Sequence, residues 1–252
     1  MPRNGSQRGK QIVIAVTGDT HGSQRLLDQS LAFLNPGDTL LVAGDFGIGF
    51  FDGPGGREEE YFDDLAARDY TILFCDGNHE NFDRLNGADV AEWHGGRVHL
   101  IRKNMIHLMR GEIYDMEGSR VFVMGGGRSL DRASRVPGES WWPQEMPDEA
   151  EYQNATRHLE QQNFEVDFIV SHTAPYDTVE YLSRLGLGIT NQVREEYPLL
   201  SYLEWVRERT SYRRWYFGHF HLDEALWKNQ VVLLDQVRRL ETGEEIGMRR
   251  HG

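Results

Sequence analysis

Three apolar segments near the start of the chain each end in a short turn that carries polar residues. Residues 12–16, 39–43 and 71–75 lead respectively into Gly18-Asp19-Thr20-His21, Gly44-Asp45 and Asp76-Gly77-Asn78-His79. Short continuous runs of β-branched and aliphatic residues are typical of strands that are buried on both faces. The sequence therefore predicts three strands, each followed by a polar turn.

The segments between these strands predict helices. Residues 23–34 carry four leucines at helical spacing behind a capping Ser23, and residues 57–68 predict a second helix. The resulting β-α-β-α-β order is typical of α/β proteins with parallel neighbouring strands. Because such sheets bind ligands at the carboxyl ends of their strands, we expect the polar turns to converge.

The second half of the chain begins with short strands and continues with strands that end in histidines. Strands 167–170 and 214–217 lead into Ser171-His172 and Gly218-His219-Phe220-His221. No repeat or linker interrupts the chain, which predicts a single domain over 1–252 with flexible tails at 1–10 and 242–252. The other expected elements are strands at 98–101, 105–109, 112–116 and 120–124, an irregular segment at 125–147, helices at 148–163 and 197–210, and strands at 231–234 and 236–240 that close the sheet.

Charge and composition limit the classes of partner that the chain can bind. The chain has 27 Lys and Arg against 40 Asp and Glu, a formal charge of −13, so no extended nucleic-acid-binding surface is expected. Bound cations would still allow phosphorylated substrates. The single Cys75 excludes an internal disulfide, and we find neither a signal-like stretch nor the roughly 20 apolar residues that span a membrane. We expect a cytoplasmic protein without a membrane partner; the sequence does not indicate its oligomeric state.

The polar residues that follow the predicted strands form a metal-ligand set. Carboxylates, imidazoles and an amide oxygen suit Mn²⁺, which we favour, or Fe or Zn²⁺, and the imidazoles argue against Mg²⁺ and Ca²⁺. A lone histidine at a strand end is usually an ordinary hydrogen-bonded residue, so the interpretation depends on the combination. The set exceeds what one ion needs and suits two ions about 3.5–4 Å apart; it comprises Asp19, His21, Asp45, Asn78, His79, His172, His219 and His221.

The blocks that contain these residues resemble those of the calcineurin-like metallophosphoesterase family, in the family's order: Gly18-Asp19-Thr20-His21-Gly22, Gly44-Asp45, Gly77-Asn78-His79-Glu80, Ser171-His172 and Gly218-His219-Phe220-His221. The resemblance implies an α/β fold that forms a four-layer αββα sandwich with a binuclear metal centre at the strand ends. It assigns one metal to Asp19, His21, Asp45 and His221. It assigns the other to Asp45, Asn78, His172 and His219, with Asp45 bridging.

The resemblance also implies a metal-dependent phosphoester hydrolase, or phosphatase. Two cations lower the pKa of a bridging water, so that hydroxide attacks phosphorus in line with the leaving group. His79 resembles the histidine that protonates the departing alkoxide; alternatively, it only holds a phosphate oxygen. Expected substrates are a phosphorylated small molecule, a nucleotide or a phosphoprotein. Two other functions stay open: a phosphodiesterase or nucleotide hydrolase at the same site, and a scaffold without catalysis.

One block departs from the family's pattern. Many members carry Gly-Asp-X-X-Asp-Arg, whose second Asp orients the catalytic histidine and whose Arg binds phosphate, whereas this chain has Ile48 and Gly49 there. The departure argues against close kinship with the Ser/Thr protein phosphatases. Asp52 and Glu80 are alternatives for orienting His79. Candidates for phosphate binding are Arg128 and Arg132, although loop arginines of this kind are often simply solvated.

Overall fold

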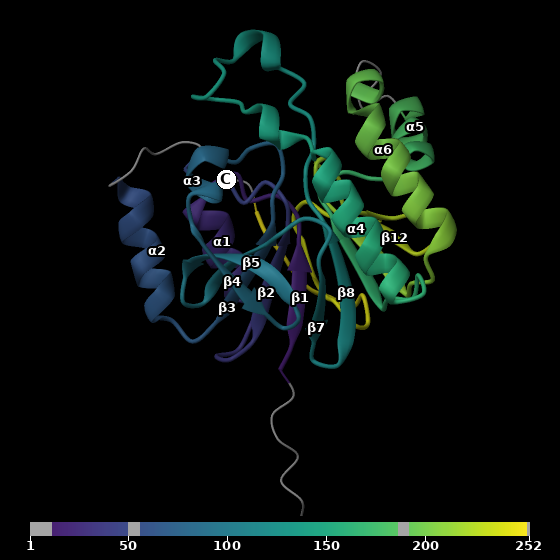
Figure 1. Ribbon diagram of the computed structural model, residues 1–252. Coiled ribbons are helices and arrows are strands. Elements are labelled where there is room, and N and C mark those ends of the chain that lie inside the picture. Colours follow the sequence, from purple (N-terminus) through teal and green to yellow (C-terminus); the bar gives the residue numbers. More distant parts are fainter. Residues whose placement is uncertain (1–11, 50–55, 186–191, 251–252) are drawn as a thin grey trace, which may run out of the picture.

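Two β-sheets lie face to face in the structure, and a layer of helices covers the outer face of each sheet (Figure 1). This computed structural model describes residues 12–49, 56–185 and 192–250. The tail predicted at 1–10 lies outside these ranges, and so does Asp52, one of the alternatives for orienting His79. The helix–sheet–sheet–helix order confirms the predicted α/β class and its four layers.

The first sheet contains the three strands that the sequence placed at its start. Its strands are β1 (Ile14–Thr17), β2 (Thr39–Ala43), β3 (Thr71–Cys75), β4 (Asp89–Trp93), β5 (Gly96–Arg102), β6 (Met105–Leu108), β13 (Gln236–Arg239) and β14 (Glu245–Met248). They are arranged in the order β14-β13-β1-β2-β3-β6-β5-β4. β1, β2 and β3 are parallel neighbours, as predicted, so their carboxyl ends meet at one edge.

The second sheet supplies the strands that end in histidines. Its strands are β7 (Ile113–Met116), β8 (Ser119–Met124), β9 (Phe168–Ser171), β10 (Arg214–Phe217), β11 (Glu224–Ala225) and β12 (Gln230–Val232). They lie in the order β11-β12-β10-β9-β8-β7, with β8, β9, β10 and β12 parallel. The carboxyl ends of β9 and β10 therefore also share one edge.

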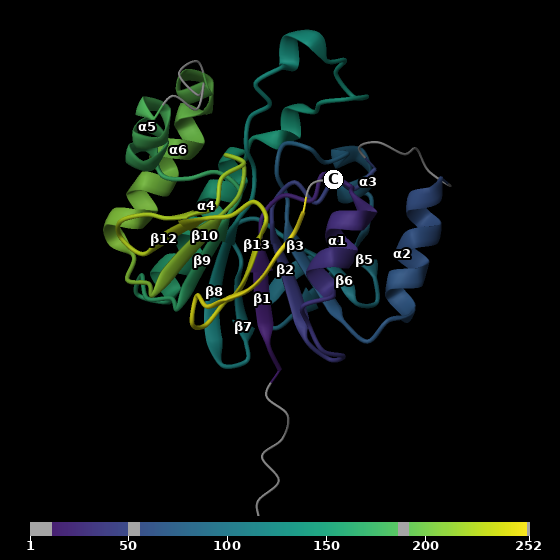
Figure 2. The same ribbon diagram turned by 180° about the vertical axis from the view of Figure 1, so that it is seen from behind.

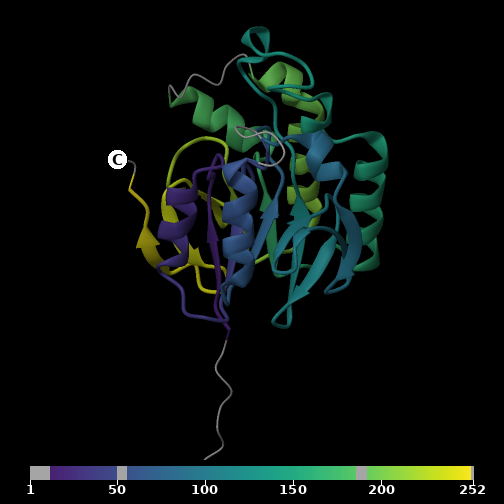
Figure 3. The same ribbon diagram turned by 90° about the vertical axis from the view of Figure 1, so that its left-hand side faces the viewer.

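Among the described residues, three α-helices cover each sheet. α1 (Gln24–Leu31), α2 (Arg57–Ala67) and α3 (Phe82–Asn86) pack on the first sheet, with α1 and α2 in front of it in Figure 3. α4 (Glu149–Gln161), α5 (Tyr176–Arg184) and α6 (Gln192–Arg209) pack on the second. Ser23 caps α1 as predicted, because its hydroxyl accepts the Leu26 N–H. No helix within the described ranges has the length and apolar character needed to cross a bilayer.

β2 is apolar from Leu40 to Ala43 because both of its faces are buried. Leu41 and Ala43 belong to the core between the two sheets, whereas Leu40 and Val42 pack against the helices. Successive strand residues point to opposite faces, so a strand with a helix layer on one side and a sheet on the other is apolar throughout. The expectation of strands buried on both faces is confirmed.

The segment 125–147 that follows β8 rises above both sheets and carries two short 3-10 turns, Arg132–Ser134 and Pro143–Glu145 (Figures 1 and 2). Trp142 anchors it, since its side chain is buried in the core under the first sheet's helices and its Nε1–H donates to Asp83 Oδ2 at 2.9 Å. The irregular segment expected here is confirmed.

The C-terminal part of the chain differs from the sequence prediction in two respects. The strands expected to close one sheet separate, because β12 joins the second sheet and β13 pairs with β1 in the first (Figure 2). Part of the tail predicted at 242–252 forms strand β14, which pairs with β13. Arg249 then lies buried and donates to the carbonyl oxygen of Asp19 at 2.9 Å. Within the described ranges, only its NH2 group reaches backbone carbonyls, those of Gly18, Asp19 and Leu234, and its Nε atom lies 3.8 Å from the Asp235 carboxylate, which carries the opposite charge.

Candidate metal centre

Polar side chains from both sheets meet where the strand ends face each other. Asp19 follows β1, Asp45 follows β2, and both are almost completely buried. Asp19 Oδ1 accepts the backbone N–H of His219 at 3.0 Å, although His219 follows β10 in the other sheet. The convergence predicted from the turns is therefore real, and it joins residues that are 200 positions apart.

One group of donors surrounds Asp19. Its Oδ2 atom lies 3.4 Å from His221 Nε2 and 3.8 Å from His21 Nε2. One ligand atom from each of these three residues can be chosen so that all lie within 4.8 Å of one another. This is the arrangement that a cation-binding site requires.

A second group surrounds Asp45. Its Oδ1 atom lies 3.3 Å from His172 Nε2, and the His172 and His219 rings are 4.7 Å apart. Asp45, His172 and His219 again offer ligand atoms within 4.8 Å of one another. Asn78 joins this group, because its Oδ1 lies 3.1 Å from His172 Nε2. The other Asp45 oxygen, Oδ2, lies 3.2 Å from His21 Nε2, so Asp45 stands between the two groups.

His79 lies beside the Asp45 carboxylate but retains contact with solvent. Its Nε2 atom is 4.0 Å from Asp45 Oδ2, and its side chain is 20% exposed. Burial lowers the pKa of His79 below its ordinary value, helped by His21 and Arg135 and opposed by Asp45. The imidazole therefore stands at the border between the buried carboxylates and the exterior, where a bound substrate could reach it.

Asp45 and His172 each favour the charged form of the other. Burial opposes ionisation of Asp45, but His172 and His79 outweigh burial and hold the pKa of this carboxyl well below its ordinary value. Burial likewise opposes a charge on His172, but the Asp45 and Asp19 carboxylates raise the pKa of His172 to about 10. In the protein without metal, a proton on His172 thus balances the buried carboxylates, which is the balancing role that a cation would take.

The backbone is strained at several of these positions. His21, Asp45, His219 and His221 have φ angles of 49°, 47°, 68° and 51°. Residues other than glycine rarely adopt this left-handed conformation, and such strain persists where the surrounding structure overdetermines it. Its concentration here indicates that the fold aims these side chains at a common point.

Glycines before the polar residues allow the strand ends to approach closely. A Cβ atom on Gly77 would lie 2.1 Å from Asp45 Oδ1, and one on Gly218 would lie 2.1 Å from Asp19 Oδ1. Any side chain at these positions would displace a carboxylate. The glycines of the Gly-Asn and Gly-His motifs are thus needed for close packing around the carboxylates.

The donor set fits divalent metal ions. Among the described residues, Asp19 Oδ2 is buried without a hydrogen bond, although two imidazoles face it. A buried carboxylate oxygen without a hydrogen-bond partner is costly and indicates a missing ligand. The mixture of carboxylate, imidazole and amide oxygen is typical of Mn²⁺, Fe or Zn²⁺ sites.

The comparison with protein families agrees with this geometry. The model of the family described as calcineurin-like phosphoesterase matches residues 12–223, from the start of the first sheet to the segment after His221. The chain belongs to the calcineurin-like phosphoesterase family. Calcineurin-like phosphoesterases hydrolyse phosphoester bonds with divalent metal ions, so this chain is a hydrolase of that class. A comparison with curated proteins gives no match.

The two arginines considered for phosphate binding lie in segment 125–147 and form ion pairs there. The Arg128 guanidinium pairs with Glu195, and the Arg132 guanidinium pairs with the buried Glu145. Arg132 also lies over the Trp141 ring, 4.4 Å from its centroid. Both side chains are partly exposed, but their charges are engaged by carboxylates in this calcineurin-like phosphoesterase.

Glu80 is one of the two alternatives for orienting His79, but its carboxylate binds backbone N–H groups of the loop after Asp45. Its carboxylate accepts the backbone N–H groups of Phe46, Gly47 and Ile48 at 2.8, 3.0 and 2.8 Å, so it fixes the loop after Asp45. The other alternative for orienting His79, Asp52, lies outside the described residues. In this calcineurin-like phosphoesterase, the block that departs from the family's pattern is therefore stabilised by a buried carboxylate.

Sequence reasoning missed Glu196 on α6. The side chain is completely buried, and Oε1 lies 3.8 Å from His219 Nε2. Burial raises the pKa of Glu196 to about 7, although Thr173 and His172 oppose the rise. No motif marks this residue, because only the packing of α6 on the second sheet brings it to His219.

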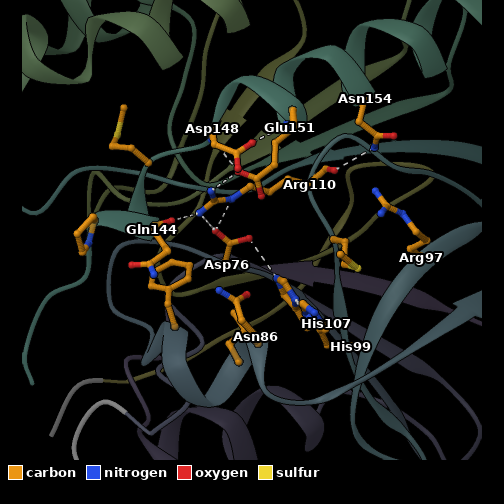
Figure 4. Close-up of a pocket in the computed structure, with 16 residues that line it drawn as sticks. Asp76, Asn86, Arg97, His99, His107, Arg110, Gln144, Asp148, Glu151 and Asn154 are labelled. Carbon is orange, nitrogen blue, oxygen red and sulfur yellow. Dashed lines mark hydrogen bonds and ion pairs between the residues drawn. The ribbon is translucent and has the colours of Figure 1, made fainter. Parts of the chain in front are cut away.

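A cavity of about 430 Å³ is lined by side chains from α3, β6 and α4 (Figure 4). Asp76, two residues before Asn78, forms its inner wall, where Oδ2 accepts two hydrogen bonds from Arg110 and Oδ1 lies 3.1 Å from His107 Nε2. His99 stacks on His107, with 2.9 Å between their Nδ1 atoms. Both histidines belong to this buried network.

Proposed function

We propose that this chain is a phosphatase that uses two metal ions. The first ion would be held by Asp19, His21, Asp45 and His221, and the second by Asp45, Asn78, His172 and His219. The observation that carries the proposal is the position of Asp45. Its two oxygens lie 3.2 Å and 3.3 Å from histidines of the two different groups, His21 and His172, which suits a bridging carboxylate.

The chemistry that such ions supply when bound is activation of water and polarisation of the phosphoryl group. The chain's own residues hold and orient the reacting groups. His79 would donate a proton to the leaving-group oxygen, which its partly exposed position permits. The negative charge of an approaching phosphate favours the protonated form of this imidazole.

The acidic character of the chain supports a role for cations in substrate binding. With a formal charge of −13, the protein has no general attraction for phosphates, so bound cations must supply it. We propose Mn²⁺ as the native ion, with Fe or Zn²⁺ as alternatives. The substrate would be a phosphorylated small molecule, a nucleotide or a phosphoprotein.

A metal-content measurement combined with a phosphoester panel tests this proposal. The purified protein should contain up to two ions per chain, lose activity on chelation, and regain it best with Mn²⁺. It should hydrolyse nitrophenyl phosphate faster than bis-nitrophenyl phosphate. Preference for the diester would indicate a phosphodiesterase at the same site, and full metal content without turnover on any ester would indicate a scaffold. Activity after complete metal removal would contradict the proposal.

A further inference from the structure

A chain of hydrogen bonds leads from the Asn78 side chain to a buried carboxylate in segment 125–147. The Asn78 Nδ2 group donates to Ser129 Oγ at 3.2 Å, and Ser129 Oγ donates to Glu145 Oε2 at 2.9 Å. The Ser129 backbone N–H donates to the other Glu145 oxygen, Oε1, at 3.0 Å. Asn78, Ser129 and Glu145 are all buried, so water does not compete for these bonds.

The chemistry of these groups sets the direction of every bond in the chain. An ionised carboxylate only accepts hydrogen bonds, so the Ser129 hydroxyl must donate its single proton to Glu145. The hydroxyl oxygen can then only accept, and the Asn78 group that faces it must be the NH₂ rather than the carbonyl. Asn78 Oδ1 is thereby turned to the opposite side, where it lies 3.1 Å from His172 Nε2.

Two arginines hold Glu145 in place and keep a positive charge near it. The Arg132 Nε–H donates to Glu145 Oε1 at 2.5 Å, and its guanidinium lies over Trp141. The second arginine, Arg110, acts on the backbone beside Glu145. Its NH2 group donates to the Gln144 carbonyl at 2.7 Å and to Asp76 Oδ2 at 2.6 Å (Figure 4). Arg110 therefore joins the turn that carries Glu145 to the end of β3, which carries Asn78.

We propose that Ser129 and Glu145 are positioning residues that fix the Asn78 carboxamide with its oxygen toward the ion that His172 would hold. This inference rests on the two-metal function proposed above. A carboxamide that is free to rotate can present either its oxygen or its NH₂ group, and the NH₂ group repels a cation. Removing the Ser129 hydroxyl removes the bond that distinguishes the two orientations, so the affinity for one ion should fall while the other site is unaffected.

The test is a calorimetric Mn²⁺ titration of the metal-free full chain. Ser129→Ala should weaken one of the two binding events by about 10–100-fold, the usual effect of losing a partner that orients a ligand. Ser129→Thr retains the hydroxyl and should restore the Mn²⁺ affinity of that binding event. The matched control is Ser134→Ala in the same segment, because the exposed Ser134 donates only to the Asp131 carbonyl; it should leave both events unchanged.

A second background separates orientation from general loosening of the site. In Asn78→Asp, both side-chain oxygens are equivalent acceptors and orientation no longer matters. Adding Ser129→Ala to Asn78→Asp should therefore cost no further affinity. The same 10–100-fold loss in this background would overturn the proposal, because it would show that the hydroxyl acts through something other than the carboxamide.

The remaining outcomes distinguish a failure of the positioning role from a failure of the proposed function. If the unaltered protein binds two ions and Ser129→Ala binds them equally well, the positioning role is wrong and the proposed function stands. If the unaltered protein binds no ion, the proposed function itself fails. Should Ser129→Ala not fold, Glu145→Gln replaces it, because a neutral amide can donate to Ser129 and release the orientation; unchanged affinity for both ions in that variant would overturn the proposal.

Discussion

Asp45 Oδ1 accepts a hydrogen bond from the backbone N–H of His79 at 2.8 Å. The bond ties the end of β2 to the end of β3. Asp45 also lies within about 3.3 Å of His172 in the second group of donors and of His21 in the first. One buried carboxylate thus holds the turn that carries Asn78 and His79 and stands between the two candidate cation sites.

Asp45→Asn should abolish metal-dependent hydrolysis while leaving the fold intact. The asparagine retains an oxygen that can accept the His79 N–H, but it lacks the negative charge that would bridge two cations. We expect kcat/KM to fall at least about a hundredfold, together with a loss of bound metal. Elemental analysis and nitrophenyl phosphate assays check this, with circular dichroism as the control for folding. Normal metal content and activity would refute the bridging role.

His79→Ala should retain both ions, because the proposed ligand set does not include His79. If His79 protonates the leaving group, turnover should fall by about 10²–10⁴-fold for an alkyl phosphate. The loss should be much smaller for nitrophenyl phosphate, whose leaving group needs little protonation. Parallel kcat measurements on the two esters decide the point. Equal losses would assign His79 to phosphate binding alone.

Gly77→Ala should disturb the site through a steric clash. The added Cβ would lie 2.1 Å from Asp45 Oδ1, so the carboxylate must move and Mn²⁺ affinity should fall. Gly118→Ala is the matched control: Gly118 has a φ of 79° and nothing within 4 Å of an added Cβ. It should lose about 1 kcal/mol of unfolding free energy from backbone strain, without a change in Mn²⁺ affinity. Equal Mn²⁺ affinity in Gly77→Ala would contradict the close-approach argument.

The buried His99 should make the protein less stable in mild acid. Burial, together with the adjacent His107, lowers the pKa of His99 from 6.5 to about 4. Between these two pH values the unfolded chain binds more protons than the folded one, so the unfolding free energy falls as the pH falls. The contribution approaches about 3 kcal/mol when the pH reaches 4.

Replacing His99 with glutamine should remove this part of the pH dependence. Urea unfolding of the metal-free protein at pH 7 and pH 4.5 measures it directly. The difference between the two unfolding free energies should be smaller in His99→Gln than in the unaltered chain. If the two proteins lose the same free energy between these pH values, His99 is not the group responsible.

Much of the local structure could be predicted from the sequence. The strands predicted at 39–43, 71–75 and 214–217 have these same bounds in the structure. Each is a continuous apolar run between turn residues, so the local pattern defines where it begins and ends. In contrast, β4 was not predicted, because Asp89–Trp93 has no apolar run and lies largely exposed at the sheet's edge.

The partners of the buried carboxylates could not be predicted. Glu145 binds Ser129, and Glu80 binds the loop after Asp45. Nothing in the sequence near Glu145 or Glu80 indicates these partners, since no local pattern distinguishes a buried acid from an exposed one. Their roles depend on which backbone N–H groups and side chains the packed sheets bring within hydrogen-bond distance.

The sequence by itself determined most of the sheet-forming segments and the polar residues in their turns, because strand periodicity and turn chemistry act over a few neighbouring residues. Only the tertiary structure decided that β12 and β13 enter different sheets, that Arg249 reaches the Asp19 carbonyl, and that Ser129 faces Asn78. These relationships join residues between about fifty and more than two hundred positions apart. They arise from the packing of two sheets, on which local preferences place no constraint.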